Sequence, residues 1–271
     1  MPELPEVETT VRGLEKVLDG ERIANVEIRR PDLRRPFPEG LGQALTGARV
    51  TALSRRAKFG TIETDRGDTL VFHLGMSGRW RIDPEEIEKH DHLVLTTGGG
   101  RVVALNDPRR FGSVDLVRSD SLSTFKPFLE LGPEPLGKAL SGQWLKEQFA
   151  GRKAAVKLLL LDQRIVAGLG NIYVCEALYR AGIDPRRAGG RIALKRLDLL
   201  AEAIPQVLDE AIAAGGSTLR DFAAPDGELG YFAKDFDVYG REGKDCRRCG
   251  GTVKRIVQGA RSTFFCPSCQ S

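Results

Sequence analysis

The first residues of the chain have the types needed for amine chemistry. A small second residue such as Pro2 licenses removal of Met1, and the product is a free secondary amine. An α-amino group has a pKa of about 7.7–8.0, so a useful fraction is neutral at cellular pH and able to form a Schiff base with a carbonyl carbon. The alternative is a plain helix start, with Pro5 near the first turn and Glu6 and Glu8 favourably placed in the helix dipole. Taken alone, these residues favour the helix start.

The cysteines near the C-terminus have the spacing of a metal site. They follow the pattern C-x2-C-x16-C-x2-C, made of Cys246, Cys249, Cys266 and Cys269. Zinc takes four tetrahedral thiolates, and each C-x2-C turn supplies two. We predict one structural Zn2+ on a β-hairpin finger whose strands are residues 252–257 and 261–265. Two disulfides are the alternative, which the absence of a secretory segment disfavours.

Other residues for metal or thiol chemistry are few. The chain has three histidines, His73, His90 and His92, so a histidine-rich catalytic metal site is not available. Asp91 lies between two of them and leaves a small metal cluster open as an alternative, and hydrogen-bonding roles for His73 and His92 are equally compatible. Cys175 lies in a predicted helix and is most simply a small buried hydrophobe. We therefore expect no catalytic metal and no organic cofactor.

Positive charge is concentrated at the C-terminus. The net charge is +4, and residues 241–271 carry seven basic and two acidic side chains, so the rest of the chain is close to neutral. Smaller basic clusters occur at residues 29–30, 34–35, 55–58 and 109–110. Separate basic clusters on a near-neutral body suit a polyanion held in a cleft. Any one pair by itself is more simply a solvated surface.

Length and composition are those of a globular protein. The 271 residues allow one large domain or two smaller ones, and 41% hydrophobic and 29% charged residues are ordinary values. No apolar run approaches the roughly 20 residues that span a membrane, and the acidic N-terminus lacks a secretory core. We expect a cytoplasmic, nucleoid-associated bacterial protein without membrane contact, and a monomer.

The hydrophobic pattern predicts a β-rich half followed by a helical half. Apolar residues recur at helical spacing from Val7 to Leu18 before Gly20, which predicts a helix over residues 5–19. Short β-rich runs separated by turns then predict an antiparallel sandwich or barrel. These runs lie at residues 22–29, 49–53, 61–64, 69–74, 92–97, 101–105 and 114–117. Helical patterns follow at residues 143–149, 154–161, 172–181 and 194–214.

Ten motifs run in order from the second residue almost to the last. They are PELPEVET at 2–9, RRAKFG at 55–60, HLGMSG at 73–78, KHDH at 89–92, NDPRRFG at 106–112, LGPEPL at 131–136, GLGNIYVCEALYRAGIDP at 168–185, GGSTLRDF at 215–222, VYGREG at 238–243 and ARSTFFCPSCQ at 260–270. In this set the chain resembles the formamidopyrimidine-DNA glycosylase family, bacterial enzymes that remove 8-oxoguanine and ring-opened purines from DNA.

The resemblance implies an α+β multidomain fold with damaged double-stranded DNA as partner. An N-terminal helix and an antiparallel β-sandwich would form the catalytic domain, followed by a linker, a helical domain with a helix–two-turn–helix element, and a four-cysteine zinc-finger β-hairpin. The implied boundaries are 1–131, 132–142, 143–240 and 241–271. Residues 217–237 are implied as the lesion-recognition loop over the flipped base, and a polar stretch of that length is more often functional than passive.

The resemblance also implies a mechanism. Pro2, freed of Met1, would attack C1′ of the damaged nucleotide, displace the base and form an iminium, while Glu3 would serve as the acid/base group that assists opening of the sugar. The 3′ phosphate would then leave by β-elimination and the 5′ phosphate by δ-elimination. Lys58 is implied as proton donor at the first step and Arg261 at the second, where a cation stabilises the developing charge.

The DNA contacts are likewise implied by the resemblance. A base inside a duplex must be flipped out before it is attacked, and Met76, Arg109 and Phe111 would fill the gap. For Met76 and Phe111 the alternative is plain core packing. Further DNA contacts are implied for phosphate groups at His90, Arg109, Arg152, Lys157, Asn171, Tyr239 and Arg261.

Two other functions stay open. An endonuclease VIII-type glycosylase has the same scaffold and chemistry but acts on oxidised pyrimidines, and the PELPEVET start and the long 217–240 stretch favour the purine-directed branch. A non-catalytic zinc-finger DNA-binding protein is the second, against which the presence of Pro2, Glu3 and Lys58 argues. Both enzymatic interpretations require that Met1 is removed, because an amide nitrogen at Pro2 is not nucleophilic and cannot attack the sugar.

Overall fold

The computed structural model describes residues 2–217 and 235–271, which fall into two compact units. Within the described residues, unit 1 contains 2–129 and 214–217, and unit 2 contains 130–213 and 235–271. The four-part division predicted from the sequence stays a prediction. Most of the implied recognition loop, residues 218–234, lies outside the described residues.

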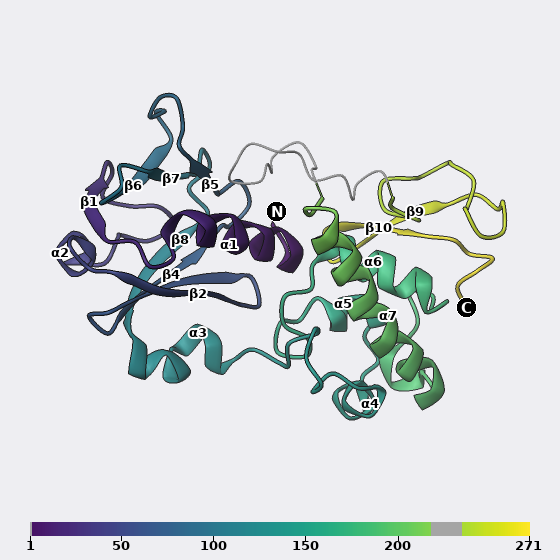
Figure 1. Ribbon diagram of the computed structural model, residues 1–271. Coiled ribbons are helices and arrows are strands. Elements are labelled where there is room, and N and C mark those ends of the chain that lie inside the picture. The colour runs from purple at the N-terminus through teal and green to yellow at the C-terminus, as the bar shows by residue number, and fades with distance from the viewer. Residues whose placement is uncertain (1, 218–234) are drawn as a thin grey trace. The chain divides into compact units, whose positions relative to one another are not determined.

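Two antiparallel sheets form the bulk of unit 1 (Figure 1). The first has the order β1-β6-β7-β5, with β1 at Ile23–Ile28, β6 at Asp91–Thr97, β7 at Val102–Asn106 and β5 at Arg79–Ile82. The second has the order β2-β3-β4-β8, with β2 at Val50–Arg56, β3 at Phe59–Thr64, β4 at Asp68–His73 and β8 at Ser113–Arg118.

Helix α1, Leu4–Leu18, packs against strands of both sheets (Figure 1). Its apolar face is buried, since Leu4, Leu14 and Leu18 have no exposed surface. The sheets also meet directly, because Phe72 of β4 and Trp80 of β5 pack edge to face with ring centroids 5.6 Å apart. One core therefore joins the helix and both sheets, and the predicted helix-plus-sandwich is confirmed.

Short elements in unit 1 were not predicted from the sequence. They are β5, the helix α2 at Leu41–Leu45, the 3-10 helix η1 at Ser119–Thr124 and the helix α3 at Lys126–Leu129. Each spans at most about two helical turns or a few strand positions, so hydrophobic periodicity has too few repeats to identify it.

Unit 2 contains the helices predicted in the second half of the chain. They are α4 at Gly142–Phe149, α5 at Val156–Leu160, α6 at Asn171–Arg180 and α7 at Leu194–Ala213, with the 3-10 helix η2 at Gly189–Arg191. Helix α6 is central, since it packs on α5 and α7 and is buried from Ile172 to Tyr179. Helix α5 begins two residues later than the predicted 154–161, because Ala155 forms an extended bridge with Ala188.

The C-terminal hairpin consists of β9, Lys254–Gln258, and β10, Arg261–Phe265. Its two-residue turn has positive φ at both positions, +55° at Gly259 and +59° at Ala260, as the right-handed twist of a hairpin favours. Arg261 pairs with Gln258 directly after this turn. The turn therefore places Arg261 at the tip of the hairpin.

No helix in the described part of the chain combines the length and apolarity needed to cross a membrane.

The close approach of β3 to the core gives a stability prediction. A Cβ at Gly60 would lie 2.1 Å from Cζ of the buried Phe72, so Gly60→Ala forces the ring to move. We expect a loss of about 1–3 kcal/mol in the free energy of unfolding, measured by urea denaturation. Gly42→Ala is the control, because nothing lies within 4 Å of its added Cβ and alanine favours its helix. An equal loss in both variants would contradict the prediction.

Candidate functional site

The N-terminal end of α1 is held by a reciprocal cap. Glu3 is the N-cap residue, its side chain accepts from the backbone of Glu6, and its own N–H donates to Glu6 Oε2 at 2.9 Å. Glu3 is 2% exposed, and Pro2 is buried as well. The helix start is therefore compatible with a buried Pro2 directly before the capping residue.

Glu6 also holds a segment far away in the sequence. Its Oε1 accepts from the backbone N–H and from the hydroxyl of Ser217, each at 2.8 Å. Both residues are buried. Sequence reasoning treated Glu6 only as a helix-dipole residue, and no local pattern could have revealed a partner 211 positions away.

A second chain of hydrogen bonds links α1 to the turn that carries Lys58. Arg55 Nε donates to Glu8 Oε2 at 2.9 Å, and Arg55 Nη1 donates to the carbonyl of Ala57 at 3.0 Å. Ala57 has φ +54°, a left-handed conformation that is unfavourable for a residue with a side chain. Lys58 follows it and is 8% exposed. The helix that follows Pro2 and the turn that carries Lys58 are thus joined through Glu8 and Arg55.

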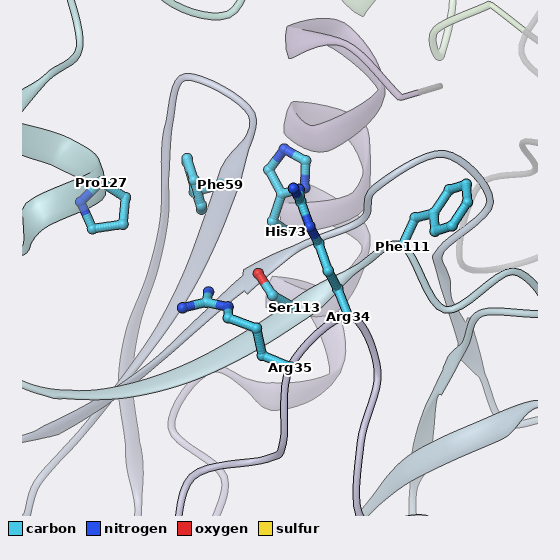
Figure 2. A pocket seen from close by; sticks show the side chains of 7 residues that line it. All are labelled: Arg34, Arg35, Phe59, His73, Phe111, Ser113 and Pro127. Carbon is cyan, nitrogen blue, oxygen red and sulfur yellow. The ribbon is translucent and has the colours of Figure 1, made fainter.

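Next to this turn lies a pocket of about 350 Å³ with two arginines in its wall (Figure 2). Its lining residues are Arg34, Arg35, Phe59, His73, Phe111, Ser113 and Pro127. Figure 2 shows Arg34 extending toward His73. In the sequence the Arg34–Arg35 pair is a basic cluster with no sign of its role.

His73 is a neutral hydrogen-bond donor in this pocket. Its Nδ1 accepts from the N–H of Gly75 at 3.0 Å, so in the neutral ring the proton is on Nε2. Burial, followed by the positive charges of Lys58, Arg34 and Arg35, lowers the pKa of His73 to about 4. At neutral pH the pocket therefore combines an imidazole N–H with the charges of the arginines, a set that suits an oxyanion.

Met76 and Phe111 come together at the rim of an adjoining pocket. It also measures about 350 Å³ and is lined by both residues with Arg34, His73 and Gly75. Met76 is 38% exposed and Phe111 44%, so the core-packing alternative is wrong for both. The Arg109 guanidinium carbon lies 4.8 Å from the centroid of the Phe111 ring, which groups the three predicted wedge residues on two neighbouring turns.

Asp107 ties these two turns together. It is buried, accepts from the Ser77 hydroxyl at 2.6 Å, and accepts from the Gly112 N–H at 2.8 Å. Gly75, with φ +63°, allows the close approach, because a Cβ there would lie 2.4 Å from the carbonyl carbon of Phe111. The turns that present Met76 and Phe111 are therefore rigidly paired.

The KHDH segment has a structural role at two of its positions. Asp91 accepts from Arg81 Nη1 at 2.8 Å and from Asn106 Nδ2 at 2.9 Å, and His92 Nε2 lies 3.0 Å from the Asp107 carbonyl. The metal-cluster alternative at Asp91 is therefore wrong, and within the described residues the four-cysteine group is the one potential metal site. His90 is half-buried, and its DNA contact stays a prediction.

In unit 2 the structure brings together Asn171, Tyr239 and the residue that follows Arg261. Asn171 Nδ2 donates to the Ser262 carbonyl at 2.9 Å and to the Tyr239 hydroxyl at 3.5 Å. The turn before α6 is fixed by Gln163, whose side chain donates to the Leu169 carbonyl and accepts from the Gly168 N–H. Asn171 thus begins α6 next to the hairpin tip.

Lys157 lies beneath the same hairpin. It is buried, and its ammonium donates to Thr263 Oγ1 at 2.7 Å and to the Ser262 carbonyl at 3.3 Å. Burial lowers the pKa of Lys157, and the charge of Arg261 lowers it further. Its described bonds brace the strand that carries Arg261. A direct phosphate contact by Lys157 stays a prediction.

Arg152 lies apart from this group. It is exposed in the turn after α4, where its carbonyl accepts from the Gly190 N–H at 3.0 Å. Its predicted phosphate contact is compatible with that exposure and stays a prediction.

Glu176 on α6 fixes the backbone beside Tyr239. Its carboxylate accepts from the N–H groups of Asp237, Val238 and Tyr239 at 2.9, 3.0 and 2.8 Å. Burial raises the pKa of Glu176, and the hydrogen bonds from the backbone act in the opposite direction. Sequence reasoning missed this residue, because a glutamate in a helix carries no sign of a main-chain partner 62 positions away.

The four cysteines fit a tetrahedral zinc ion. Their sulfur atoms all lie within 4.8 Å of one another, with 3.8 Å between Cys246 and Cys269 and 3.5 Å between Cys249 and Cys266. Zinc–sulfur bonds of about 2.3 Å place tetrahedral sulfurs about 3.8 Å apart. The cysteines are free thiols, so the disulfide alternative is wrong. They would hold one structural Zn2+ with no open position.

Sequence profiles of three domains match the chain. The formamidopyrimidine-DNA glycosylase N-terminal domain matches residues 1–114, the formamidopyrimidine-DNA glycosylase H2TH domain matches residues 131–223, and the zinc finger found in FPG and IleRS matches residues 243–271. The H2TH match includes α5 and α6, and the zinc-finger match includes the four cysteines.

Curated relatives carry the same name over their whole length. Formamidopyrimidine-DNA glycosylases of Novosphingobium aromaticivorans and Rhizorhabdus wittichii are 71% and 66% identical over 270 residues, with full coverage of both chains. The enzyme of Erythrobacter litoralis is 62% identical over 271 residues, again with full coverage.

Solved structures give the same result for the fold. Lactococcus lactis Fpg in complex with DNA containing an abasic site is 35% identical with a TM-score of 0.92 and full coverage of both chains. The Thermus thermophilus MutM (Fpg) protein is 39% identical with a TM-score of 0.89, covering 99% of this chain and 98% of its own. The chain belongs to the formamidopyrimidine-DNA glycosylase family.

Proposed function

We propose that this protein excises oxidised purines, 8-oxoguanine and formamidopyrimidines, from double-stranded DNA and then cuts the strand at the abasic site. The observation that carries this proposal is the buried cap that fixes Glu3 at the start of α1 in the unit that also carries Lys58. Family membership and the likeness to an Fpg bound to damaged DNA support it.

Pro2 would supply the nucleophile. Once Met1 is removed, its nitrogen lone pair bonds to C1′ of the damaged nucleotide as the bond from C1′ to the base breaks, and the base leaves with that electron pair. Glu3 would transfer protons at the sugar as the ring opens and the nitrogen–carbon bond becomes an iminium. The carboxyl group of the residue next to the amine can both donate and accept a proton.

The iminium would then drive strand cleavage. Loss of a proton from C2′ sends electrons toward the positive nitrogen and expels the 3′ phosphate, and a second elimination expels the 5′ phosphate. Lys58 would serve the first elimination and Arg261 the second. Cations beside departing phosphates stabilise charge that develops only as the bond breaks.

The cationic pocket of unit 1 would hold the backbone of the DNA. Arg34, Arg35 and the N–H of neutral His73 can donate to phosphate oxygens, and the neutral ring adds no further positive charge to the pocket. Met76, Arg109 and Phe111 would enter the duplex where the nucleotide leaves it. Their exposure on paired, rigid turns fits that task.

In unit 2 a second group would bind phosphate. Asn171, Tyr239 and Arg261 lie around Ser262, with Lys157 bracing the strand below, and Arg152 and His90 would extend the contact surface in their own units. The zinc would order the hairpin that carries Arg261 and take no part in bond breaking. A partner of this kind would place the protein at the nucleoid.

The Schiff base gives a direct test of the function. Incubation with duplexes containing 8-oxoguanine opposite cytosine, followed by borohydride, is expected to trap a covalent protein–DNA adduct, because reduction of the iminium is irreversible. Duplexes that contain thymine glycol are expected to give little adduct. Pro2→Leu, which keeps Met1, should give no adduct, with the N-terminus verified by mass spectrometry. An adduct with thymine glycol alone would instead indicate the endonuclease VIII-type activity. No adduct with either duplex would refute the proposed glycosylase activity.

The two proposed proton donors should separate the elimination steps. Arg261→Ala is expected to raise the ratio of β- to δ-product at least about 10-fold, because only the second departing phosphate loses its cation. Lys58→Met should slow formation of both products. Lys254→Ala is the control, since it lies on the same hairpin opposite Phe265. Denaturing gels resolve the products, and an unchanged ratio in Arg261→Ala would contradict the assignment.

Glu6 is predicted to position the nucleophile. In Glu6→Gln the side-chain NH2 group must face one of the two backbone N–H groups, that of Glu3 or that of Ser217. Because both are donors, that hydrogen bond is lost. A bond to a buried charged group contributes about 1.5–3 kcal/mol, so we expect the single-turnover excision rate to fall about 10- to 100-fold. Glu15→Gln, on the exposed face of α1, should excise at the normal rate. Equal rates in both variants would refute the role.

A further inference from the structure

Tyr179 of α6 reaches one of the zinc-ligand cysteines. Its hydroxyl oxygen lies 3.2 Å from Cys246 Sγ, and the two residues are 2% and 3% exposed. A cysteine bound to zinc is a thiolate, which accepts hydrogen bonds and has none to give. In the zinc-loaded protein the direction is therefore fixed, and the Tyr179 hydroxyl donates to the sulfur.

The surroundings of this bond are apolar. Tyr179 and Cys246 belong to a buried cluster with Cys175, Val238 and Phe264. The Arg248 guanidinium carbon lies 4.6 Å from the centroid of the Tyr179 ring, so the first C-x2-C turn itself covers the tyrosine. Water is kept from the hydroxyl, and a hydrogen bond in such a place is stronger than one in contact with solvent.

Other hydrogen bonds to the sulfurs come from the backbone of the finger itself, as at Cys246 from the N–H groups of Arg248 and Cys249. The Gly251 N–H donates to Cys249 Sγ at 3.4 Å within the turn of the finger itself. Tyr179, by contrast, lies outside the matched zinc-finger residues 243–271. Tyr179 is therefore a side-chain donor to Cys246 from the helical part of the chain.

We propose that Tyr179 is a positioning residue of the zinc site, which retains the metal by donating to the Cys246 thiolate. The hydrogen bond orients the Cys246 side chain and withdraws charge from its sulfur, as outer-shell partners of metal ligands do. It also attaches the finger to α6 at a second point. Asn171 at the start of the same helix bonds to Ser262, about 12 Å along the helix axis.

Zinc release from the purified, zinc-loaded full-length protein tests this proposal. We expect Tyr179→Phe to release zinc to a chromophoric chelator about 10-fold faster, as loss of an outer-shell hydrogen bond costs other metal sites. Phenylalanine keeps the ring and its packing. Tyr239→Phe is the matched control, because its ring packs on Phe264 of the same finger with centroids 5.0 Å apart while its hydroxyl accepts from Asn171. Its release rate should be that of the wild type.

A spectroscopic measurement separates this role from a purely structural one. In the cobalt-substituted protein, the thiolate-to-metal charge-transfer band should move to lower energy in Tyr179→Phe and stay in place in Tyr239→Phe, because only the first change removes a hydrogen bond from a ligand. In a Cys246→His background, which has no thiolate at that position, Tyr179→Phe should have no further effect on release. Equal release rates in wild type and Tyr179→Phe, or equal acceleration in Tyr239→Phe, would overturn the proposal.

Discussion

The hydrogen bond from the Glu3 N–H to the Glu6 carboxylate is the contact on which the candidate active site depends. A nucleophile at the end of a chain has no preceding residue to restrict it, and fixing one residue costs about 1–2 kcal/mol in backbone entropy. A hydrogen bond to a buried charged group contributes about 1.5–3 kcal/mol. One such bond is thus enough to hold Glu3, and through it Pro2, in a single direction. The second oxygen of Glu6 remains for Ser217, so one carboxylate sets the position of both segments.

Electrostatic repulsion is the second constraint on unit 1. Burial, together with the charges of Lys58, Arg34 and Arg35, lowers the pKa of His73 to about 4. A protonated ring would add a fourth positive charge to these three side chains and oppose folding. Because the ring is neutral at pH 7, His73 does not destabilise the fold there. Its unfolded pKa of about 6.5 is higher, and the unfolded chain therefore takes up the proton first as the pH falls. The stability contributed by a neutral His73 is lost between about pH 6.5 and pH 4.

The elements that could be predicted from the sequence are those with local signals. Helix α1, the long strands and the cysteine finger follow from periodicity, turn residues and C-x2-C spacing, and the motifs identified the family. The contacts that position the site have no such signals. Glu8 meets Arg55 47 positions away, and Glu6 meets Ser217 211 positions away. Each of these glutamates looks like an ordinary helix residue until the sheet or a distant turn supplies its partner. The local sequence specifies which side chains are present, but only the assembled fold determines their hydrogen-bond partners.

Glu6 and Glu176 illustrate why buried charge is retained in this fold. Burying a carboxylate costs several kcal/mol, and a well-packed apolar residue often replaces a buried ion pair without loss. That exchange fails here, because the partners are backbone N–H groups at Ser217 and at residues 237–239. A methionine in place of Glu176 would leave those groups buried and unpaired, at about 1–3 kcal/mol each. Side chains can be exchanged in pairs, but a backbone N–H cannot be removed by substitution, except by proline. The carboxylates are therefore required by the main chain that they bind, on both sides of residues 218–234.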